Sequence, residues 1–128
     1  MRRDMDLIRQ LMLKLEEVND EPSAILHFEF DELSIEGFTT NQVEYHLDLL
    51  VESGLIDQGG HGFLDGFMFR RLTWEGHDFV DSVRDDEVWR KTRQGATAAG
   101  GFTLDLLKDL AKGFIKKQVE EKTGISLG

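Results

Sequence analysis

The chain has 128 residues, of which 40% are apolar, and it contains no cysteine. A chain of this length forms about one domain with a single core, so disorder is excluded as the default. The lack of cysteine excludes disulfides, thiolate metal sites and a cysteine nucleophile. The formal charge of -10 argues against an electrostatic grip on nucleic acid or on anionic lipid.

Charged residues interrupt the apolar residues of the amino terminus, so it lacks the continuous apolar segment of a signal peptide. No apolar run elsewhere approaches membrane-spanning length. We therefore expect a soluble, cytoplasmic protein with no membrane span. The acidic charge is unevenly spread, because residues 21–60 contain nine Asp or Glu and no Lys or Arg.

Residues 3–18 are predicted to form an amphipathic helix, because apolar side chains recur at three- and four-residue spacing. These side chains are Leu7, Ile8, Leu11, Leu15 and Val18. The following residues, from Leu26, alternate between apolar and polar side chains. Leu33 and Ile35 continue the alternation. This pattern predicts short strands.

A second helix is predicted from Thr40, because Thr39 and Gln42 have the spacing of a reciprocal capping box. Gly54 is placed where the chain leaves such a helix in a left-handed conformation, and Leu50 and Leu55 are the pair expected to touch there. The buried stripe of the helix consists of Val43, Leu47, Leu50 and Val51.

Two short strands are predicted next, at residues 55–58 and 67–72, with a glycine-rich loop between them at residues 59–66. They would form a wing-like hairpin. Thr73 is then expected to cap a helix that carries Phe79, Val80 and Val83, and a shorter helix restarts at Asp85 or Asp86. Both tryptophans, Trp74 and Trp89, are expected to complete the core of the small domain.

Residues 95–101, with the sequence GATAAGG, are predicted to be a flexible linker. A last amphipathic helix runs from Thr103 to about Lys122. The predicted organisation is therefore a domain at residues 1–94, a linker at 95–101 and a separate helical segment at 102–128.

The order of elements is that of a winged helix-turn-helix domain, so the expected fold class is α+β. The segments DMDLIR, IEGF, YHLDLLVESGLID and RLTWEGHDFVDSVRDDEVWRKT, read together, resemble the bacterial and prophage family called domain of unknown function 2513. The resemblance covers roughly Arg2 to Arg93. It implies a winged-helix-like fold and a frequent location in phages and mobile elements, and it implies no activity.

The helix at residues 40–52 would be the recognition helix of such a domain. Its outward side chains are predicted to be Asn41, Gln42, Glu44, Tyr45, His46, Asp48 and Glu52. Affinity for DNA comes mainly from Lys and Arg contacts to phosphates, and this helix has neither. We therefore expect it to bind a protein partner through Asn41, Gln42, Glu44, Tyr45 and Asp48.

The alternative is a DNA-binding transcriptional regulator that uses its wing and the region of Arg90 to Arg93. Its candidate phosphate contacts are Arg70, Arg71, Arg90, Lys91 and Arg93. Seven acidic residues accompany the six basic ones between residues 61 and 94. We therefore favour solvated charge, balanced by neighbouring carboxylates, over a phosphate-binding wing.

Catalytic and metal signatures are weak in this sequence. His27, Glu29 and Asp31 would point the same way on a strand, but no fourth ligand is fixed and no His pair has four-residue spacing. The glycines around His61 lack the Lys-Ser/Thr ending of a phosphate loop, and no nucleophile motif occurs. We therefore expect no enzyme, no catalytic residue, no metal and no cofactor.

The last helix has a wide apolar face that needs a cover. Three covers are open: the parent domain, a second copy, and a lipid surface facing its lysines. We expect self-association through Leu106, Leu107, Leu110 and Phe114, and so a homo-oligomer. Taken together, the sequence predicts a non-enzymatic winged-helix-like binding module, an accessory protein of a phage or mobile element that binds an unidentified protein.

Overall fold

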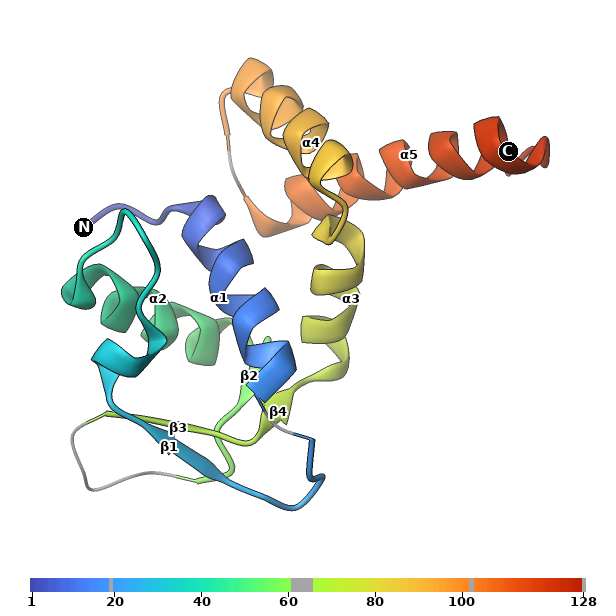
Figure 1. Cartoon of the computed structure of the whole chain (residues 1–128). Helices are drawn as coiled ribbons and strands as arrows, with labels where there is room; N and C mark the ends of the chain where they lie inside the picture. The colour runs from blue at the N-terminus through green and yellow to red at the C-terminus, as the bar shows by residue number, and fades with distance from the viewer. Residues whose placement is uncertain (19, 61–65, 102, 128) are drawn as a thin grey trace. The chain divides into compact units, whose positions relative to one another are not determined.

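A computed structural model describes residues 1–18, 20–60, 66–101 and 103–127 (Figure 1). Over these residues the chain is α+β, with five α-helices, one 3-10 turn and four short strands. In chain order they are α1 Met5–Val18, β1 Leu26–Phe28, η1 Phe30–Leu33, α2 Thr40–Ser53, β2 Ile56–Asp57, β3 Phe67–Phe69, β4 Arg71–Leu72, α3 Trp74–Val83, α4 Asp86–Ala99 and α5 Leu104–Thr123. The contacts divide the chain into two compact units, Met1–Val80 and Asp81–Gly128.

The predicted first helix is confirmed as α1. Its stripe is buried at Leu7, Ile8, Leu11 and Leu15. Asp4 caps its start, because the Asp4 carboxylate accepts the backbone N–H groups of Asp6 at 2.9 Å and Leu7 at 3.2 Å. These bonds satisfy two amides that have no partner within the helix.

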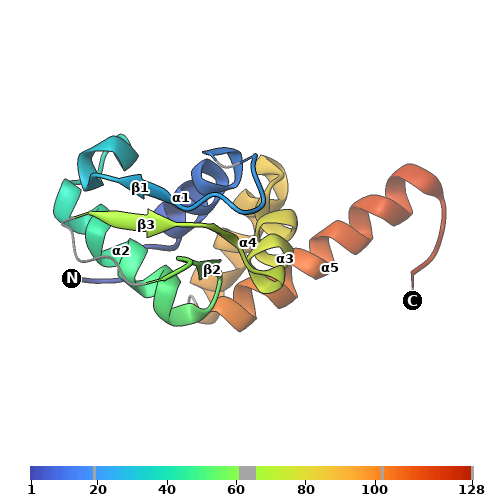
Figure 2. The same cartoon turned by 90° about the horizontal axis from the view of Figure 1, so that it is seen from below.

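The strands form two small antiparallel sheets, β1 with β3 and β2 with β4. Leu26 lies opposite Phe69 in the first sheet, and Ile56 lies opposite Leu72 in the second. The predicted returning strand at 67–72 therefore pairs in two halves, the first with β1 and the second with β2. Figure 2 shows β1 and β3 side by side. Of the predicted loop between the strands, residues 61–65 lie outside the described part of the chain.

The prediction that the alternation continues as a strand through Leu33 and Ile35 is wrong. Residues Phe30–Leu33 form the 3-10 turn η1. Local hydrogen bonds explain the difference, because the Glu32 carboxylate accepts the Glu29 N–H at 2.9 Å while the Glu29 carbonyl accepts the Glu32 N–H at 3.0 Å. Leu33 and Ile35 are buried without being paired in a sheet.

The second helix is confirmed at both ends. The Gln42 N–H donates to the Thr39 hydroxyl at 3.1 Å, and the Thr39 N–H donates to the Gln42 side-chain oxygen at 2.8 Å. Gly54 ends α2 with a φ of 78°, a conformation that glycine adopts without steric cost. Leu50 and Leu55 are both buried, as expected for this exit.

The core of the first unit is formed by large aliphatic and aromatic side chains from its helices and strands. Fully buried members are Leu7, Leu11, Met12, Leu15, Leu33, Val43, Leu47, Leu50, Phe69 and Phe79. The rings of Phe67 and Phe69, two residues apart on β3, stack with centroids 6.4 Å apart. Because side chains alternate across a strand, both rings lie on the same face of the sheet.

In the second unit, the prediction of a flexible linker at residues 95–101 is wrong for residues 95–99, which belong to α4. Asp85 caps α4 by accepting the Val88 N–H at 2.9 Å, and Gly100 ends it with a φ of 81°. Alanine favours helix strongly, and the one glycine of this segment inside the helix, Gly95, costs only about 1 kcal/mol. The helix therefore runs to its left-handed glycine stop.

The last helix is confirmed as α5, with Thr103 as its cap. It packs on α4, the preceding helix of the same unit. Leu107 and Ala111 are fully buried, so the expectation that Leu107 meets a second copy is wrong. The other three residues proposed for self-association, Leu106, Leu110 and Phe114, are half-buried.

Candidate binding surfaces

The outward face of α2 carries four of the five residues predicted to bind a partner. Asn41, Glu44, Tyr45 and Asp48 are exposed, and Glu52 continues the face at the next turn. The fifth residue, Gln42, is half-buried and occupied in the capping box. We call the five exposed residues, from Asn41 to Glu52, the α2 acidic face. It holds three carboxylates and no cation.

The prediction that His46 points outward is wrong, because its side chain is only 1% exposed. Its Nε2 accepts the backbone N–H of Asp4 at 2.8 Å, and its Nδ1 lies 2.7 Å from the Gln42 carbonyl oxygen. Nδ1 therefore carries the proton of a neutral ring, since Nε2 acts as an acceptor. His46 links the start of α1 to α2 and belongs to the interior.

Two of the candidate phosphate contacts, Arg70 and Arg71, lie on the strand segment at the end of the predicted wing. Both approach one carboxylate oxygen, Asp57 Oδ2, at 3.4 Å from Arg70 Nη1 and 3.8 Å from Arg71 Nε. The other oxygen of Asp57 accepts the Gly59 N–H at 2.8 Å. The Arg71 side chain is 63% exposed and so remains accessible.

The remaining candidates, Arg90, Lys91 and Arg93, lie on α4 in the second unit. Arg90 forks onto both oxygens of Glu87, at 2.6 and 3.2 Å, and the Lys91 ammonium lies 4.0 Å from the same carboxylate. The hydrogen bond from Arg90 lowers the pKa of Glu87, and the same bond raises the pKa of Arg90. Arg90 is thus committed to a neighbour on its own helix.

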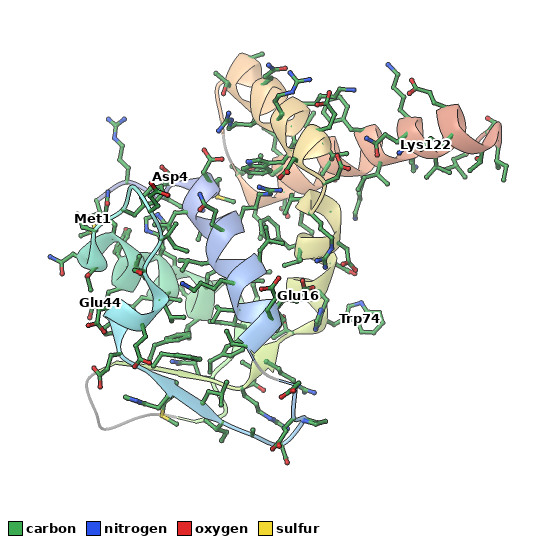
Figure 3. The ribbon with its side chains drawn as sticks, viewed as in Figure 1. Met1, Asp4, Glu16, Glu44, Trp74 and Lys122 are labelled. Carbon is green, nitrogen blue, oxygen red and sulfur yellow. The ribbon has the colours of Figure 1, made fainter. Side chains whose placement is uncertain are left out.

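The two tryptophans have opposite environments. Trp89 is 5% exposed, as predicted for a core residue, whereas Trp74 is 84% exposed, so the prediction for Trp74 is wrong. The buried face of α3 is formed by Gly76, Phe79, Val80 and Val83. Trp74 lies two residues before Gly76, close to the opposite side of a helix with 3.6 residues per turn. Figure 3 shows its ring projecting away from α3.

Thr73, the residue before Trp74, is held by three hydrogen bonds. Its N–H donates to the Leu55 carbonyl at 3.0 Å, and its hydroxyl donates to the Gly54 carbonyl at 2.6 Å. The same hydroxyl accepts the Gly76 N–H at 3.1 Å, which confirms the predicted cap. Gly76 also has no room for a side chain, because a Cβ there would collide with the Leu55 carbonyl. The exit of α2 therefore fixes the entry of α3.

A hollow of about 340 Å³ lies beside the exposed indole. We call it the Trp74 hollow. Its lining comes from the end of β2, from β4 and from the first turn of α3: Asp57, Arg71, Leu72, Thr73, Trp74 and His77. Arg71 also lines two smaller hollows, with Asp20, Glu21 and Arg70 in one and Glu16 in the other. Carboxylates therefore outnumber guanidinium groups along this side of the unit.

Among the residues that the structure describes, there is no cluster of metal-ligating side chains and no helix suited to cross a membrane. In this part of the chain, no three His, Asp or Glu side chains come together in a way that could hold a metal ion. β1 ends at Phe28, so Glu29 and Asp31 do not share a strand with His27. None of the described helices combines the length and the apolar character that crossing a membrane requires.

The chain belongs to a known protein family. The family is described as "Hypothetical protein (DUF2513)", and it matches residues 2–102. The chain is also similar to an uncharacterized protein of Haemophilus influenzae, with 32% identity over 122 residues. That match covers 93% of this chain and 99% of the Haemophilus protein. No solved structure matches the chain.

Proposed function

We propose that this protein is a non-enzymatic, winged-helix-like binding module that acts through contacts with another protein. Within this proposal it is an accessory protein of a phage or mobile element. The α2 acidic face carries the proposal, because Glu44, Asp48 and Glu52 project from a helix whose two ends are both capped. A surface of one charge sign selects partners of the opposite sign. The proposed partner is therefore a protein with a basic patch.

The winged-helix comparison is supported by the pairing of the strands. β3 and β4 together form the returning strand of the proposed wing, and the second half pairs with β2, the strand that follows α2. The position of a recognition helix would then be that of α2. This helix lacks the Lys and Arg side chains that supply most of the affinity for DNA.

The arrangement of the basic residues also supports a protein partner over DNA. Arg90 and Lys91 share Glu87, Arg84 lies 3.1 Å from Asp81, and Arg70 shares Asp57 with Arg71. Phosphate contacts by these side chains would have to compete with carboxylates that are already in place. The neighbouring carboxylates offset most of the positive charge of these Arg and Lys side chains, so little of it is left for a polyanion.

Affinity capture with charge-reversed variants tests the proposal. The bait is the full chain, incubated with a lysate of the organism that carries it. In one variant, Glu44 and Asp48 are both replaced by Lys. In the matched control, Asp109 and Glu121 on α5, which are also exposed, are both replaced by Lys. We expect a basic protein that the natural chain and the control retain, that the α2 variant loses, and whose capture weakens as salt is raised.

Titration with DNA from the neighbourhood of the gene, at two salt concentrations, provides the opposing outcome. Specific binding that falls steeply with salt would replace this proposal with a DNA-binding regulator that uses Arg70, Arg71 and the Arg90 to Arg93 region. Equal capture by the natural chain and the α2 variant would also contradict the role given to the α2 acidic face.

A further inference from the structure

Trp74 is the most exposed large apolar side chain in the described part of the molecule. Its exposed fraction of 84% exceeds those of Met1, Ile25, Tyr45, Ile125 and Leu127. Removing a large apolar side chain from water favours folding, and the fold leaves that gain unused at Trp74. Tryptophan is also the residue most enriched among those that dominate the binding energy of protein interfaces.

The indole is exposed on a fixed backbone. Three hydrogen bonds hold Thr73, the preceding residue, and Gly76 lies against the Leu55 carbonyl two residues later. A partner that binds here does not have to order a mobile segment, so it avoids most of the entropy cost of immobilising one. Only the two side-chain torsions of the tryptophan remain to be restricted.

The charges around the indole select the partner. The Trp74 hollow itself holds one carboxylate and one guanidinium group, the ion pair of Asp57 and Arg71. The two hollows that share Arg71 with it add three carboxylates and one guanidinium group: Glu16, Asp20 and Glu21 against Arg70. Glu75 and Asp78 are exposed on the same first turns of α3. The side chains around the Trp74 hollow therefore have a net negative charge, which repels an anionic ligand and attracts a cation.

The flat face of an indole attracts a cation as well, since its quadrupole is negative over the ring. We propose that the Trp74 hollow binds a Lys or Arg side chain on a basic segment of a partner protein, with the cation over the indole and its charge balanced by the surrounding carboxylates. This inference rests on the proposed function as a protein-binding module. It adds a second contact, separate from the α2 acidic face.

Titration of the isotope-labelled full chain by NMR tests the inference. The two tryptophans give two indole N–H signals, and a Trp74→Phe variant identifies the one that belongs to Trp74. The probes are a short unstructured peptide of alternating Arg and Gly, the same peptide with Glu in place of Arg, and a short single-stranded oligothymidylate. We expect the arginine peptide to shift the Trp74 signal, to leave the buried Trp89 signal in place, and to lose effect as salt is raised.

Substitution at Trp74 gives the second readout. We expect Trp74→Ala to weaken arginine-peptide binding at least about fivefold, as for other tryptophans at the centre of an interface. Trp74→Phe should recover part of that loss, because phenylalanine keeps an aromatic face with a weaker attraction for cations. Trp74 is exposed, so both variants should unfold at nearly the same denaturant concentration as the natural chain.

Each contrary outcome has a defined meaning. A shift of the Trp74 signal by oligothymidylate would make this a base-stacking surface, and a shift by the acidic peptide would reverse the proposed charge preference. No shift with any probe would overturn the inference. Capture of the cellular partner separates the two proposals. If the α2 variant loses the partner and Trp74→Ala retains it, the proposed function stands but the Trp74 hollow has no part in it.

Discussion

The two compact units of the chain hold their elements together by different means. In Met1–Val80 the decisive hydrogen bonds join residues far apart in the sequence, such as Asp4 with His46 and Thr73 with Gly54. In Asp81–Gly128 the principal packing is between α4 and α5, two consecutive helices. Each of these has its own side-chain cap and its own glycine stop.

Two glycines, one in each unit, differ in the room that they leave for a side chain. Gly76 in the first unit lies so close to the Leu55 carbonyl that the entry of α3 allows no added atom there. Gly113 on α5 has open space where a side chain would be. The entry of α3, which borders the Trp74 hollow, is therefore fixed by a long-range contact, whereas α5 has room for a side chain at Gly113.

Gly76→Ala tests the close contact in the first unit and has the largest expected effect. The added methyl group collides with the Leu55 carbonyl oxygen and lies 3.2 Å from the Met12 Cε. Backbone has to move to relieve this clash, so we expect the free energy of unfolding to fall by about 1–3 kcal/mol. Denaturant unfolding measures the loss, and the Trp74 indole signal should shift at the same time. Unchanged stability would mean that α3 does not need its close approach to Leu55.

Gly113→Ala tests the open space in the second unit, and we expect it to raise the free energy of unfolding instead of lowering it. Gly113 is exposed, lies inside α5 and would gain a side chain without any new neighbour within 4 Å. We expect a gain of about 0.4–1 kcal/mol, because alanine restricts the unfolded chain and favours helix. Hydrogen exchange of the α5 amides measures this gain. Gly95→Ala is the matched control on α4, and its gain should be smaller because the new Cβ lies 3.3 Å from Leu110 Cδ1.

The smallest expected effect concerns pH at the cap of α4. The hydrogen bond from the Val88 N–H lowers the pKa of Asp85 below its ordinary value of 3.8. The carboxylate therefore stabilises the folded state fully above the ordinary pKa, and this contribution is lost as the pH falls through the lowered one. Asp85→Asn keeps a capping oxygen but cannot titrate, so its melting temperature should fall less between pH 5 and pH 3 than that of the natural chain.

The control for this experiment is Asp105→Asn. Asp105 is an acidic residue in the first turn of α5, and its replacement removes the same negative charge. The acid dependence of the Asp105→Asn protein should follow that of the natural chain more closely than the Asp85→Asn protein does. An identical pH dependence for all three proteins would show that the Asp85 cap does not contribute to acid sensitivity.

The helices of this protein could be predicted from local signals. The capping box of Thr39 with Gln42 and the left-handed Gly54 defined α2, and the same logic located the cap at Thr73. It also placed the start of α4 at Asp85 or Asp86, and Asp85 is the cap. These signals are reliable because capping bonds form between residues three apart in the chain. The apolar stripe of α1 was equally clear, since a 3.6-residue period is itself a local property.

Local signals failed where two tendencies competed. The alternation at Leu33 and Ile35 suited a strand, yet the Glu29 and Glu32 bonds turned the chain into η1. The composition of residues 95–99 suggested a linker, yet these residues add a turn to α4 because nothing before Gly100 stops the helix. In both cases composition alone did not show which hydrogen bonds the backbone would make.

The candidate surfaces were less predictable than the helices. The outward position of Glu44 and Asp48 followed from the helical period, but the burial of His46 depended on Asp4, more than forty residues away. Trp74 was assigned to the core by size. Its five-residue offset from Phe79 places it off the buried stripe of α3, and this signal was available in the sequence.

The sequence by itself determined the capped helices, the acidic character of α2 and the family to which the chain belongs, because each depends on residue types at short or fixed spacing. Only the tertiary structure decided which side chains lie inside. His46 is buried because a backbone amide of another segment needs an acceptor, and Trp74 is exposed because the contact of Gly76 with Leu55 turns the opposite side of α3 outward. Such outcomes depend on contacts between distant residues, which no local pattern specifies.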